Sequence, residues 1–342
     1  LQSQFPMQEL SVMGLVEVLP RAPQLLRRIA ETERAIRDLA PDVVVTIDAP
    51  GFCFRLAKRL KGSGIRLVHY VAPSVWAWRP GRAVRVAALY DHLLTLLPWE
   101  PPYFERHGLA CTFVGHPAVA EPPASDGPAF RERHRIPTDV PLLAVLPGSR
   151  QGEIRRLLPV FGAALEQLAR RIEGLQAVVA TVPATASAVA VATEGWPVPV
   201  SIADAAERAD AFAAADAAIA ASGTVSVELA ATRTPMVVCY RMAPLTIWIA
   251  RRLVHIPYVS LVNLALEEGA IPELIQEDCT ADAIAAAAGK LLVDPVARET
   301  QIAALDKALV LLGANATPSD SAARAVLDVI AARTTQQETD NG

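Results

Sequence analysis

The amino-acid sequence predicts an α/β fold made of two doubly wound, Rossmann-like domains that face each other across a cleft. Short apolar runs rich in β-branched residues alternate with helical patterns along the chain, which is typical of parallel sheets with helices on both faces. The alternation occurs as two series, and a proline-rich stretch separates them. At 342 residues, 52% of them hydrophobic, the chain is long enough to bury two cores.

The domain boundaries follow from where each series of strands begins and ends. The first domain is expected over residues 1–120, with strands at 42–47, 66–71, 93–97 and 112–114 and with helices over 56–61 and 82–88. A linker is expected over 121–141. The second domain is expected over 142–333, with strands at 142–146, 177–182, 198–202, 217–220 and 236–240 and closing helices from 281 onward. The polar tail 334–342 is predicted to be disordered.

Charge narrows the class of partner. The net charge of −4 argues against a general nucleic-acid binder. Between Ala49 and Tyr90, however, the chain has no Asp or Glu, and its basic residues there are Arg55, Lys58, Arg59, Lys61, Arg66, Arg79, Arg82 and Arg85. This basic segment is expected to attract anionic substrates or an anionic membrane surface, and the solvated faces of two helices are an equal alternative.

The four cysteines, Cys53, Cys111, Cys239 and Cys279, are far apart and form no CxxC pair. They indicate neither a disulfide framework nor a zinc site, and they fit a reducing cytosol. The sequence has no apolar run long enough to cross a bilayer and no signal-peptide pattern, so work on a lipid would take place from the membrane surface. The lack of a GxGxxG motif argues against a dinucleotide dehydrogenase. No cofactor and no metal are predicted.

Two strand ends in the second domain are suited to a nucleoside diphosphate, because ligands of open parallel sheets bind beyond the carboxyl ends of the strands. The strand at 142–146 ends in Pro147-Gly148-Ser149-Arg150, where a turn before a helix offers N–H groups to a phosphate and Arg150 adds a bidentate cation. An ordinary turn with a surface arginine is the alternative. Ser222-Gly223-Thr224 precedes a second helix, and Glu228, four residues after Thr224 on the same face, is suited to ribose hydroxyls.

Two features of the first domain are suited to an acceptor. Asp48 directly follows the strand at 42–47 and could remove a proton from an attacking hydroxyl, although capping of the next helix is equally open. The loop Ser74-Val75-Trp76-Ala77-Trp78-Arg79 follows the strand at 66–71. Two tryptophans and an arginine are suited to lining a groove for a sugar or an acyl chain, and interdomain packing is the alternative.

The segment Leu10–Arg28 mixes apolar residues with arginines, which is the pattern of a membrane-interface element. Lipid contacts are expected from Val16, Leu19, Leu25 and Leu26. A buried core helix is the competing interpretation, and Pro20 and Pro23 argue against one continuous helix.

Seven short motifs occur in a fixed order along the chain. They are Asp48-Ala49-Pro50, Ser74–Arg79 (SVWAWR), Phe113–Pro117 (FVGHP), Leu146–Arg150 (LPGSR), Ala221–Thr224 (ASGT), Pro235–Val238 (PMVV) and Tyr258–Leu261 (YVSL) followed by Asn263. This ordered set closely resembles the lipid-A-disaccharide synthases, bacterial glycosyltransferases of the GT-B fold, and the likeness runs from about Glu9 to about Ala332. Each motif alone is weak, and the ordered set is specific.

The resemblance implies an activity, its substrates and its location. It implies inverting, metal-independent transfer of the sugar of UDP-2,3-diacylglucosamine to the 6-hydroxyl of 2,3-diacylglucosamine 1-phosphate, which gives a β-1,6-linked disaccharide 1-phosphate and UDP. It also implies a cytoplasmic protein, peripheral on the inner face of the inner membrane of a Gram-negative bacterium, with an anionic membrane surface as a partner. A homodimer is left open.

The resemblance also implies residue roles. Asp48 would be the general base or would position the acceptor, and Arg150 and Asn263 would be the other catalytic residues. The donor would be held by Gly148, Ser149, Arg150, Ser222, Gly223, Thr224 and Glu228, with uracil against Tyr240, Arg241 and Met242. The acceptor would contact Ser74, Trp76, Trp78, Arg79 and His116.

Three departures from the family pattern stand beside the resemblance. Gly51 and Cys53 replace an Asp and an Asn, and Val262 replaces a proline. The family's opening strand and Gly-rich Ser-Gly-Asp loop, roughly its first fifty residues, are expected to be missing here, which puts this chain's own activity in question. The competing interpretations are a GT-B enzyme with a different lipid acceptor, a UDP-N-acetylglucosamine epimerase, and a non-catalytic UDP-sugar binder. The apolar segment Leu10–Leu26 argues against the epimerase.

Overall fold

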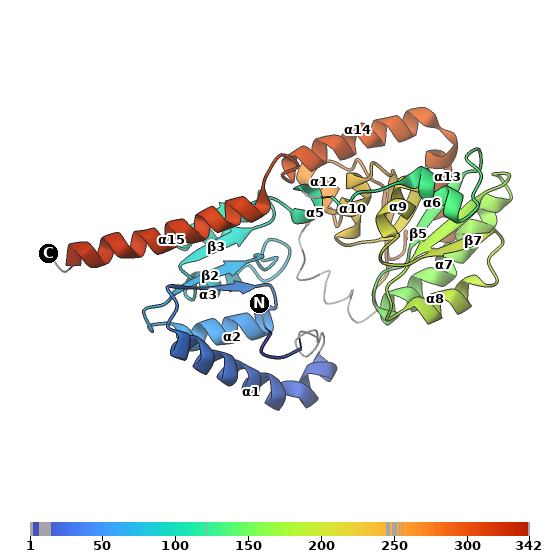
Figure 1. Ribbon diagram of the computed structural model, residues 1–342. Coiled ribbons are helices and arrows are strands. Elements are labelled where there is room, and N and C mark those ends of the chain that lie inside the picture. The colour runs from blue at the N-terminus through green and yellow to red at the C-terminus, as the bar shows by residue number, and fades with distance from the viewer. Residues whose placement is uncertain are drawn as a thin grey trace. The chain divides into compact units, whose positions relative to one another are not determined.

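The computed structural model describes residues 3–6, 15–120, 122–243, 247, 252, 254 and 256–340, and for 15–21 and 333–340 it describes the backbone alone. The chain forms two compact units, Leu1–His116 with Ala316–Gly342 and Pro117–Asn315 (Figure 1). Among the described residues, no helix is both long enough and apolar enough to cross a membrane.

The unit boundaries differ from the expected ones at two places. The stretch 121–141, expected as a linker, is part of the second unit and contains α6 (Gly127–Arg133). The last helix, α15 (Pro318–Asp340), was expected to close the second domain and to give way to a disordered tail, but it belongs to the first unit and continues to Asp340. Its apolar side chains Ala325, Val326 and Val329 pack against the first sheet, which explains its placement.

The first unit has a parallel sheet whose strands follow in chain order: β1 (Val43–Ile47), β2 (Arg66–Tyr70), β3 (His92–Thr95) and β4 (Ala110–Phe113). One face is covered by α1 (Leu15–Leu39), α2 (Pro50–Leu60), α3 (Arg82–Ala87) and α4 (Pro101–Glu105), and the other face is covered by α15. Neighbouring residues of β2 serve the two layers, because successive strand side chains point to opposite faces: Leu67 packs with α2 and Val68 with α15.

The expectation that Pro20 and Pro23 exclude one continuous helix is wrong, because α1 includes both. Each proline removes one backbone hydrogen bond of the helix. Beyond them, Ile29 is 1% exposed in the core and Arg37 donates to the carbonyl of Arg59 in α2. Packing of the later turns therefore outweighs the local cost of the prolines.

The second unit has a six-stranded parallel sheet in the order β10 (Glu273–Ile275), β9 (Met236–Tyr240), β8 (Ala217–Ala221), β5 (Leu142–Leu146), β6 (Gln176–Ala180) and β7 (Val200–Ala203). The chain starts in the middle at β5, moves outward through β6 and β7, and then crosses to β8 and moves outward on the other side. The strand order reverses between β5 and β8. In doubly wound sheets this switch point is where ligands bind.

Helices cover both faces of this second sheet. One layer contains α7 (Gln151–Ala169), α8 (Ala186–Thr193) and α13 (Ala281–Val293). The other contains α6, α9 (Arg208–Ala214), α10 (Val225–Ala231), α12 (Leu261–Leu266) and α14 (Pro295–Leu311), and α5 (Pro117–Ala120) lies against α10. All five residues of β5 are buried, with Leu143 and Val145 facing the first layer and Leu142, Ala144 and Leu146 the second. Both faces are thus closed, and the carboxyl ends of the strands remain for a site.

Candidate active site

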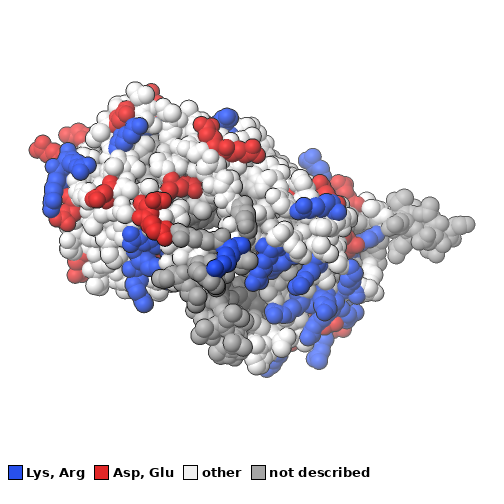
Figure 2. All heavy atoms as spheres, turned by 180° about the vertical axis from the view of Figure 1, so that it is seen from behind, with Lys and Arg blue, Asp and Glu red and all other residues white. Residues whose placement is uncertain are grey.

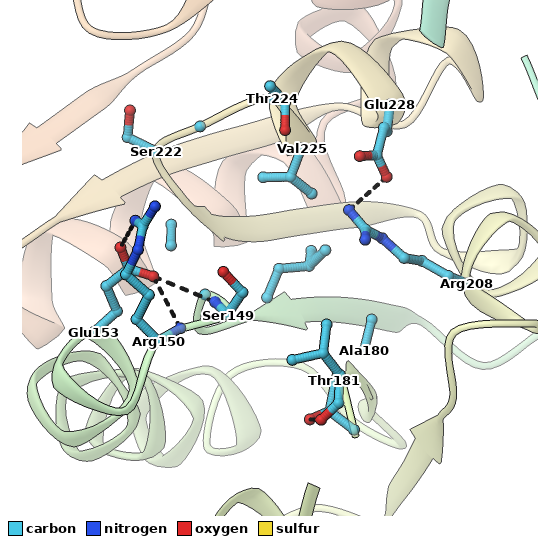
Figure 3. Close-up of a pocket in the computed structure, with 15 residues that line it drawn as sticks. Ser149, Arg150, Glu153, Ala180, Thr181, Arg208, Ser222, Thr224, Val225 and Glu228 are labelled. Carbon is cyan, nitrogen blue, oxygen red and sulfur yellow. Dashed lines mark hydrogen bonds and ion pairs between the residues drawn. The ribbon is translucent and has the colours of Figure 1, made fainter. Parts of the chain in front are cut away.

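A cavity of about 390 Å³ opens at the switch point of the second sheet (Figure 3). Its walls come from the turns that follow three neighbouring strands and from the first residue of α9. The lining residues include Leu146 of β5, Ala180 of β6 and Ala221 of β8 at the strand ends, with Gly148, Ser149, Arg150, Glu153, Thr181, Arg208, Ser222, Gly223, Thr224 and Glu228 around them. All seven donor residues predicted between Gly148 and Glu228 line this cavity.

The turn between β5 and α7 is held by the side chain of Glu153. Its Oε2 accepts the backbone N–H groups of Ser149 and Arg150, each at 3.3 Å, and its Oε1 pairs with Arg150 Nη1 at 2.7 Å. Glu153 is only 9% exposed. The expectation that this turn offers free N–H groups to a phosphate is therefore corrected: a carboxylate of the protein already takes two of them, as carboxylates do at helix N-termini.

Gly148 is required by this arrangement. Its φ of +103° lies where only glycine is unstrained, and a Cβ would come within 2.4 Å of Glu153 Oε2. The glycine therefore lets the backbone approach the carboxylate that holds the turn.

The opposite wall is formed by the turn between β8 and α10. The backbone N–H of Ser222 donates to the carbonyl of Cys239 at 3.1 Å, and its hydroxyl donates to the carbonyl of Val259 at 3.3 Å. These bonds fix Ser222 against β9 and the loop before α12. The first turn of α10, with Thr224 and Val225, then lines the cavity with the positive end of its peptide dipoles.

Glu228 projects into the cavity from α10 and pairs with Arg208, with 2.5 Å between Glu228 Oε2 and Arg208 Nη2 (Figure 3). Burial raises the pKa of Glu228, and the guanidinium of Arg208 partly offsets this. Arg208 and Glu153 were missed in the sequence. Glu153 follows β5 and Arg208 follows β7. The rule that ligands bind beyond the carboxyl ends of parallel strands would therefore have found both, if it had been applied to every charged residue after these strands.

The residues expected against uracil are not among those that line this cavity. The guanidinium of Arg241 donates to the carbonyl of Cys279 at 2.5 Å, so it ties the end of β9 to the loop before α13. Tyr240 is half-buried, and burial together with the nearby Glu153 carboxylate raises its pKa. Met242 is half-buried. Tyr240 therefore lies near the Glu153 carboxylate that holds the cavity turn.

Asn263, expected to be catalytic, is fully buried. Its Nδ2 donates to the carbonyl of Ile271 and to Glu273 Oε1, both at 2.8 Å, and its Oδ1 accepts the N–H of Ile271 at 2.8 Å. Both ends of the amide are therefore engaged inside the protein. The amide therefore faces the protein interior in this structure, and the predicted catalytic role of Asn263 stays a prediction.

Asp48, in the first unit, is exposed at the carboxyl end of β1. It does not cap α2: Ala49 is the N-cap residue, and α2 has no side-chain cap hydrogen bond there. Asp48 and Ala49 have φ values of +47° and +42°. Two consecutive non-glycine residues in the left-handed region cost about 1–3 kcal/mol each, and such strain is concentrated at functional sites.

The aromatic loop after β2 divides into an inner and an outer part. Trp76 is half-buried and its Nε1 donates to Glu100 Oε1 at 3.2 Å. Trp78 is 38% exposed, and the guanidinium carbon of Arg79 lies 4.5 Å from its ring centre. Ser74 is exposed as well. The outer part of the loop therefore offers an aromatic and cationic surface.

The remaining residues expected to bind lipid lie in different surroundings. His116 is 8% exposed, and burial lowers its pKa, so it is a neutral internal side chain. Leu25 is half-buried and Leu26 is 50% exposed on α1. The side chains of Val16 and Leu19 lie outside the described residues.

Comparison with known proteins agrees with this architecture. A structure of a UDP-N-acetylglucosamine 2-epimerase from Listeria monocytogenes matches with a TM-score of 0.57 and 13% identity, covering 88% of this chain and 79% of that chain. A spinosyn rhamnosyltransferase structure with thymidine diphosphate has a TM-score of 0.58 and 14% identity, covering 90% and 78%. A staphylococcal MnaA structure with UDP has a TM-score of 0.58 and 12% identity, covering 83% and 76%. The parallel sheets and these neighbours define a protein of the GT-B fold.

Sequence comparison narrows the class. The family model described as lipid-A-disaccharide synthetase matches residues 1–327. A lipid-A-disaccharide synthase of Rhodospirillum centenum is 53% identical over 338 residues, with 97% of this chain and 84% of the relative covered, and one of Ruegeria pomeroyi is 50% identical over 340 residues, with 96% and 84% covered. The chain belongs to the lipid-A-disaccharide synthase family, whose members are glycosyltransferases of lipid A biosynthesis.

Proposed function

We propose that this chain joins UDP-2,3-diacylglucosamine to 2,3-diacylglucosamine 1-phosphate and releases UDP. The observation that carries the proposal is the cavity at the switch point of the second sheet, where the turn at Ser222, the cation Arg150 and the carboxylate Glu228 meet. These groups are suited to a diphosphate and a ribose. Family membership supplies the sugar and the lipid.

In the proposed reaction, the 6-hydroxyl oxygen of the acceptor attacks C1 of the donor sugar. The bond from C1 to the diphosphate oxygen breaks, and its electron pair leaves with UDP. Arg150 stabilises the charge that develops on the diphosphate. Asp48 takes the hydroxyl proton or orients the hydroxyl, and its exposed position at the end of β1 leaves it accessible to an acceptor.

We also propose that the protein works at the cytoplasmic face of the inner membrane of a Gram-negative bacterium. Lys and Arg side chains gather on the first unit, where Arg55, Lys58, Arg59 and Lys61 of α2 and the following turn are exposed (Figure 2). Each basic residue near an anionic membrane surface contributes about 1 kcal/mol. Co-sedimentation with anionic vesicles, weakened by salt and by Lys58→Glu with Lys61→Glu, would support this. Equal binding to zwitterionic vesicles would contradict it.

The experiment that tests the activity supplies both substrates to the purified chain and measures disaccharide 1-phosphate and UDP by mass spectrometry. Formation of both in equal amounts supports the proposal. An isomerised UDP-sugar without disaccharide would favour an epimerase. Bound UDP without product would favour a non-catalytic binder. Product formed only when another lipid is supplied would show that the enzyme uses a different acceptor.

A further inference from the structure

Arg208 reaches the cavity from the start of α9, away from the turn that carries Arg150 (Figure 3). Arg150 and Arg208 are the two guanidinium groups among the described residues that line the cavity. The guanidinium carbon of Arg208 lies 5.5 Å from the ring centre of Phe212, one helical turn further along α9, and its Nη2 reaches Glu228 Oε2. The Arg208 side chain thus packs on the ring of Phe212 and points into the cavity.

The two arginines are paired with the two carboxylates that line the same cavity. Arg150 pairs with Glu153, which is held by two backbone N–H groups and is 9% exposed, so this carboxylate has little freedom to turn away. The side chains of Arg208 and Glu228 are 31% and 30% exposed, and among the described residues Arg208 is the one side chain that pairs with the Glu228 carboxylate. Arg150 is 61% exposed, so either arginine can move, but of the two carboxylates Glu228 has fewer partners and is the freer to exchange its arginine.

Helix stability does not account for Arg208. It is the first residue of α9, where the peptide dipoles favour an acidic side chain and disfavour a cation. A half-exposed ion pair also contributes little to folding, since solvent screens it. A nucleoside diphosphate, by contrast, brings negative charge into a cavity whose own charges are balanced, and it needs a cation that can change partner.

We infer that Arg208 is the second cation of the nucleotide site and that it exchanges partners when a UDP-sugar binds. In the ligand-free cavity it holds the Glu228 carboxylate. With nucleotide bound, Glu228 accepts the ribose hydroxyls and Arg208 turns its guanidinium to the diphosphate. As the bond from C1 to the diphosphate oxygen breaks, the electron pair stays on UDP, and Arg208 shares with Arg150 the stabilisation of that charge. The inference rests on the proposed function, because it takes UDP as the ligand.

The test measures binding of UDP, uridine and pyrophosphate by calorimetry to the wild type, Arg208→Ala, Arg208→Lys and Glu228→Gln. Loss of a charge-assisted hydrogen bond weakens binding by on the order of 10- to 100-fold. We expect Arg208→Ala to lose this much affinity for UDP and pyrophosphate while uridine binding is unchanged or tighter, because Glu228 is released. Arg208→Lys keeps the charge without the planar fork and is expected to lie between. Glu228→Gln should weaken uridine and leave pyrophosphate binding unchanged or tighter, because Arg208 is released from its ion pair.

The matched control is Arg170→Ala, which breaks an arginine–glutamate pair of the same unit on the exposed end of α7. It is expected to bind all three probes like the wild type. Equal weakening of UDP and uridine in Arg208→Ala would mean that Arg208 only orients Glu228, and unchanged UDP affinity would remove it from the site; either result overturns the inference alone. A wild type that binds neither UDP nor uridine would overturn the inference together with the proposed function.

Discussion

The side-chain amide of Asn263 donates to Oε1 of Glu273 at 2.8 Å, inside the second unit and away from the residues that line the cavity. The same carboxylate accepts the backbone N–H groups of Val259 at 2.8 Å and Ser260 at 2.9 Å. The carbonyl of Val259 in turn accepts the hydroxyl of Ser222, which lines the cavity. A buried amide is thus linked to the turn between β8 and α10 through one carboxylate and one loop.

Asn263→Ala is expected to destabilise the protein and to weaken UDP binding. The substitution leaves the N–H and carbonyl of Ile271 without their Asn263 partner and removes one of the two donors to Glu273 Oε1, which costs about 2–4 kcal/mol by the usual penalties for buried polar groups. Urea unfolding and calorimetry measure the two effects.

The matched control for Asn263 is Gln301→Ala. Gln301 is also a buried amide of the second unit, and its Oε1 accepts the N–H of Met236. Among the described residues, Gln301 makes no hydrogen bond to Ser222 or to the loop that carries Val259, so Gln301→Ala should lose stability and keep UDP affinity. Equal loss of UDP affinity in both variants would show that general destabilisation, and not the loop, is responsible.

Gly148→Ala is expected to impair nucleotide binding. The added Cβ would meet Glu153 Oε2, so the carboxylate must leave the N–H groups of Ser149 and Arg150. Gly108→Ala is the control, because Gly108 has a φ of +80° with nothing within 4 Å of its Cβ. Both variants should lose about 1 kcal/mol of stability from backbone strain, and only Gly148→Ala should lose UDP affinity. If Gly108→Ala lost it as well, the collision with Glu153 would not be the cause.

Asp48→Asn is expected to retain UDP binding and to lose turnover by roughly 10²- to 10⁴-fold, the usual contribution of a general base. The side chain is exposed and belongs to the first unit, whereas the cavity proposed to hold the nucleotide belongs to the second. Steady-state turnover and calorimetry separate the two effects. Asp38→Asn, an exposed aspartate of α1, should behave like the wild type. Near-normal turnover of Asp48→Asn would remove Asp48 from the mechanism.

Glu100 makes stability depend on pH. It is 3% exposed and accepts the N–H groups of Leu96, Leu97 and Trp76, and burial raises its pKa to about 7. Because this value exceeds the ordinary 4.5, the folded state holds the proton more tightly. The stability from this proton is fully present below pH 4.5 and is lost as the pH rises through 7. The loss is at most about 3 kcal/mol.

Glu100→Gln tests this, because glutamine does not titrate. The free energy of unfolding of the wild type, relative to Glu100→Gln, should fall between pH 4.5 and 7. Glutamine loses one acceptor at every pH, which shifts the curve and adds no slope. Burial lowers the pKa of His69 to about 4 and gives the opposite slope at acidic pH, but both proteins share it. Parallel stability profiles would contradict the assignment.

The strands were largely predictable, because a buried parallel strand is a continuous apolar run bounded by breakers. The runs Leu142–Leu146 and Met236–Tyr240 are strands with the predicted bounds, and prolines stand directly before both. β10 (Glu273–Ile275) was not predicted, since three half-buried residues make no recognisable run. α15 was assigned to the wrong unit because an amphipathic pattern does not say which sheet it covers.

A site residue was predictable where its residue type and its position shortly after a strand were enough to indicate it. Ser222, Thr224 and Glu228, predicted to bind the donor, all line the cavity, and their binding role stays a prediction. The role of Asn263 could not be predicted, because a motif does not reveal that Ile271 and Glu273 engage both ends of the amide. Likewise, the sequence does not tell that Glu153 turns back onto the N–H groups of its own helix.

The return of α15 to the first sheet affects the order in which the protein can fold during synthesis. The first unit consists of two stretches of chain, and the whole second unit lies between them in the sequence. The ribosome therefore releases the contiguous second unit before α15 emerges. Until then, Val68, Leu94 and Val114 of the first unit lack the packing partner that Ala325 of α15 provides. During that interval the nascent first sheet exposes the apolar face that α15 later covers, and this face is therefore open to aggregation until the last helix is made.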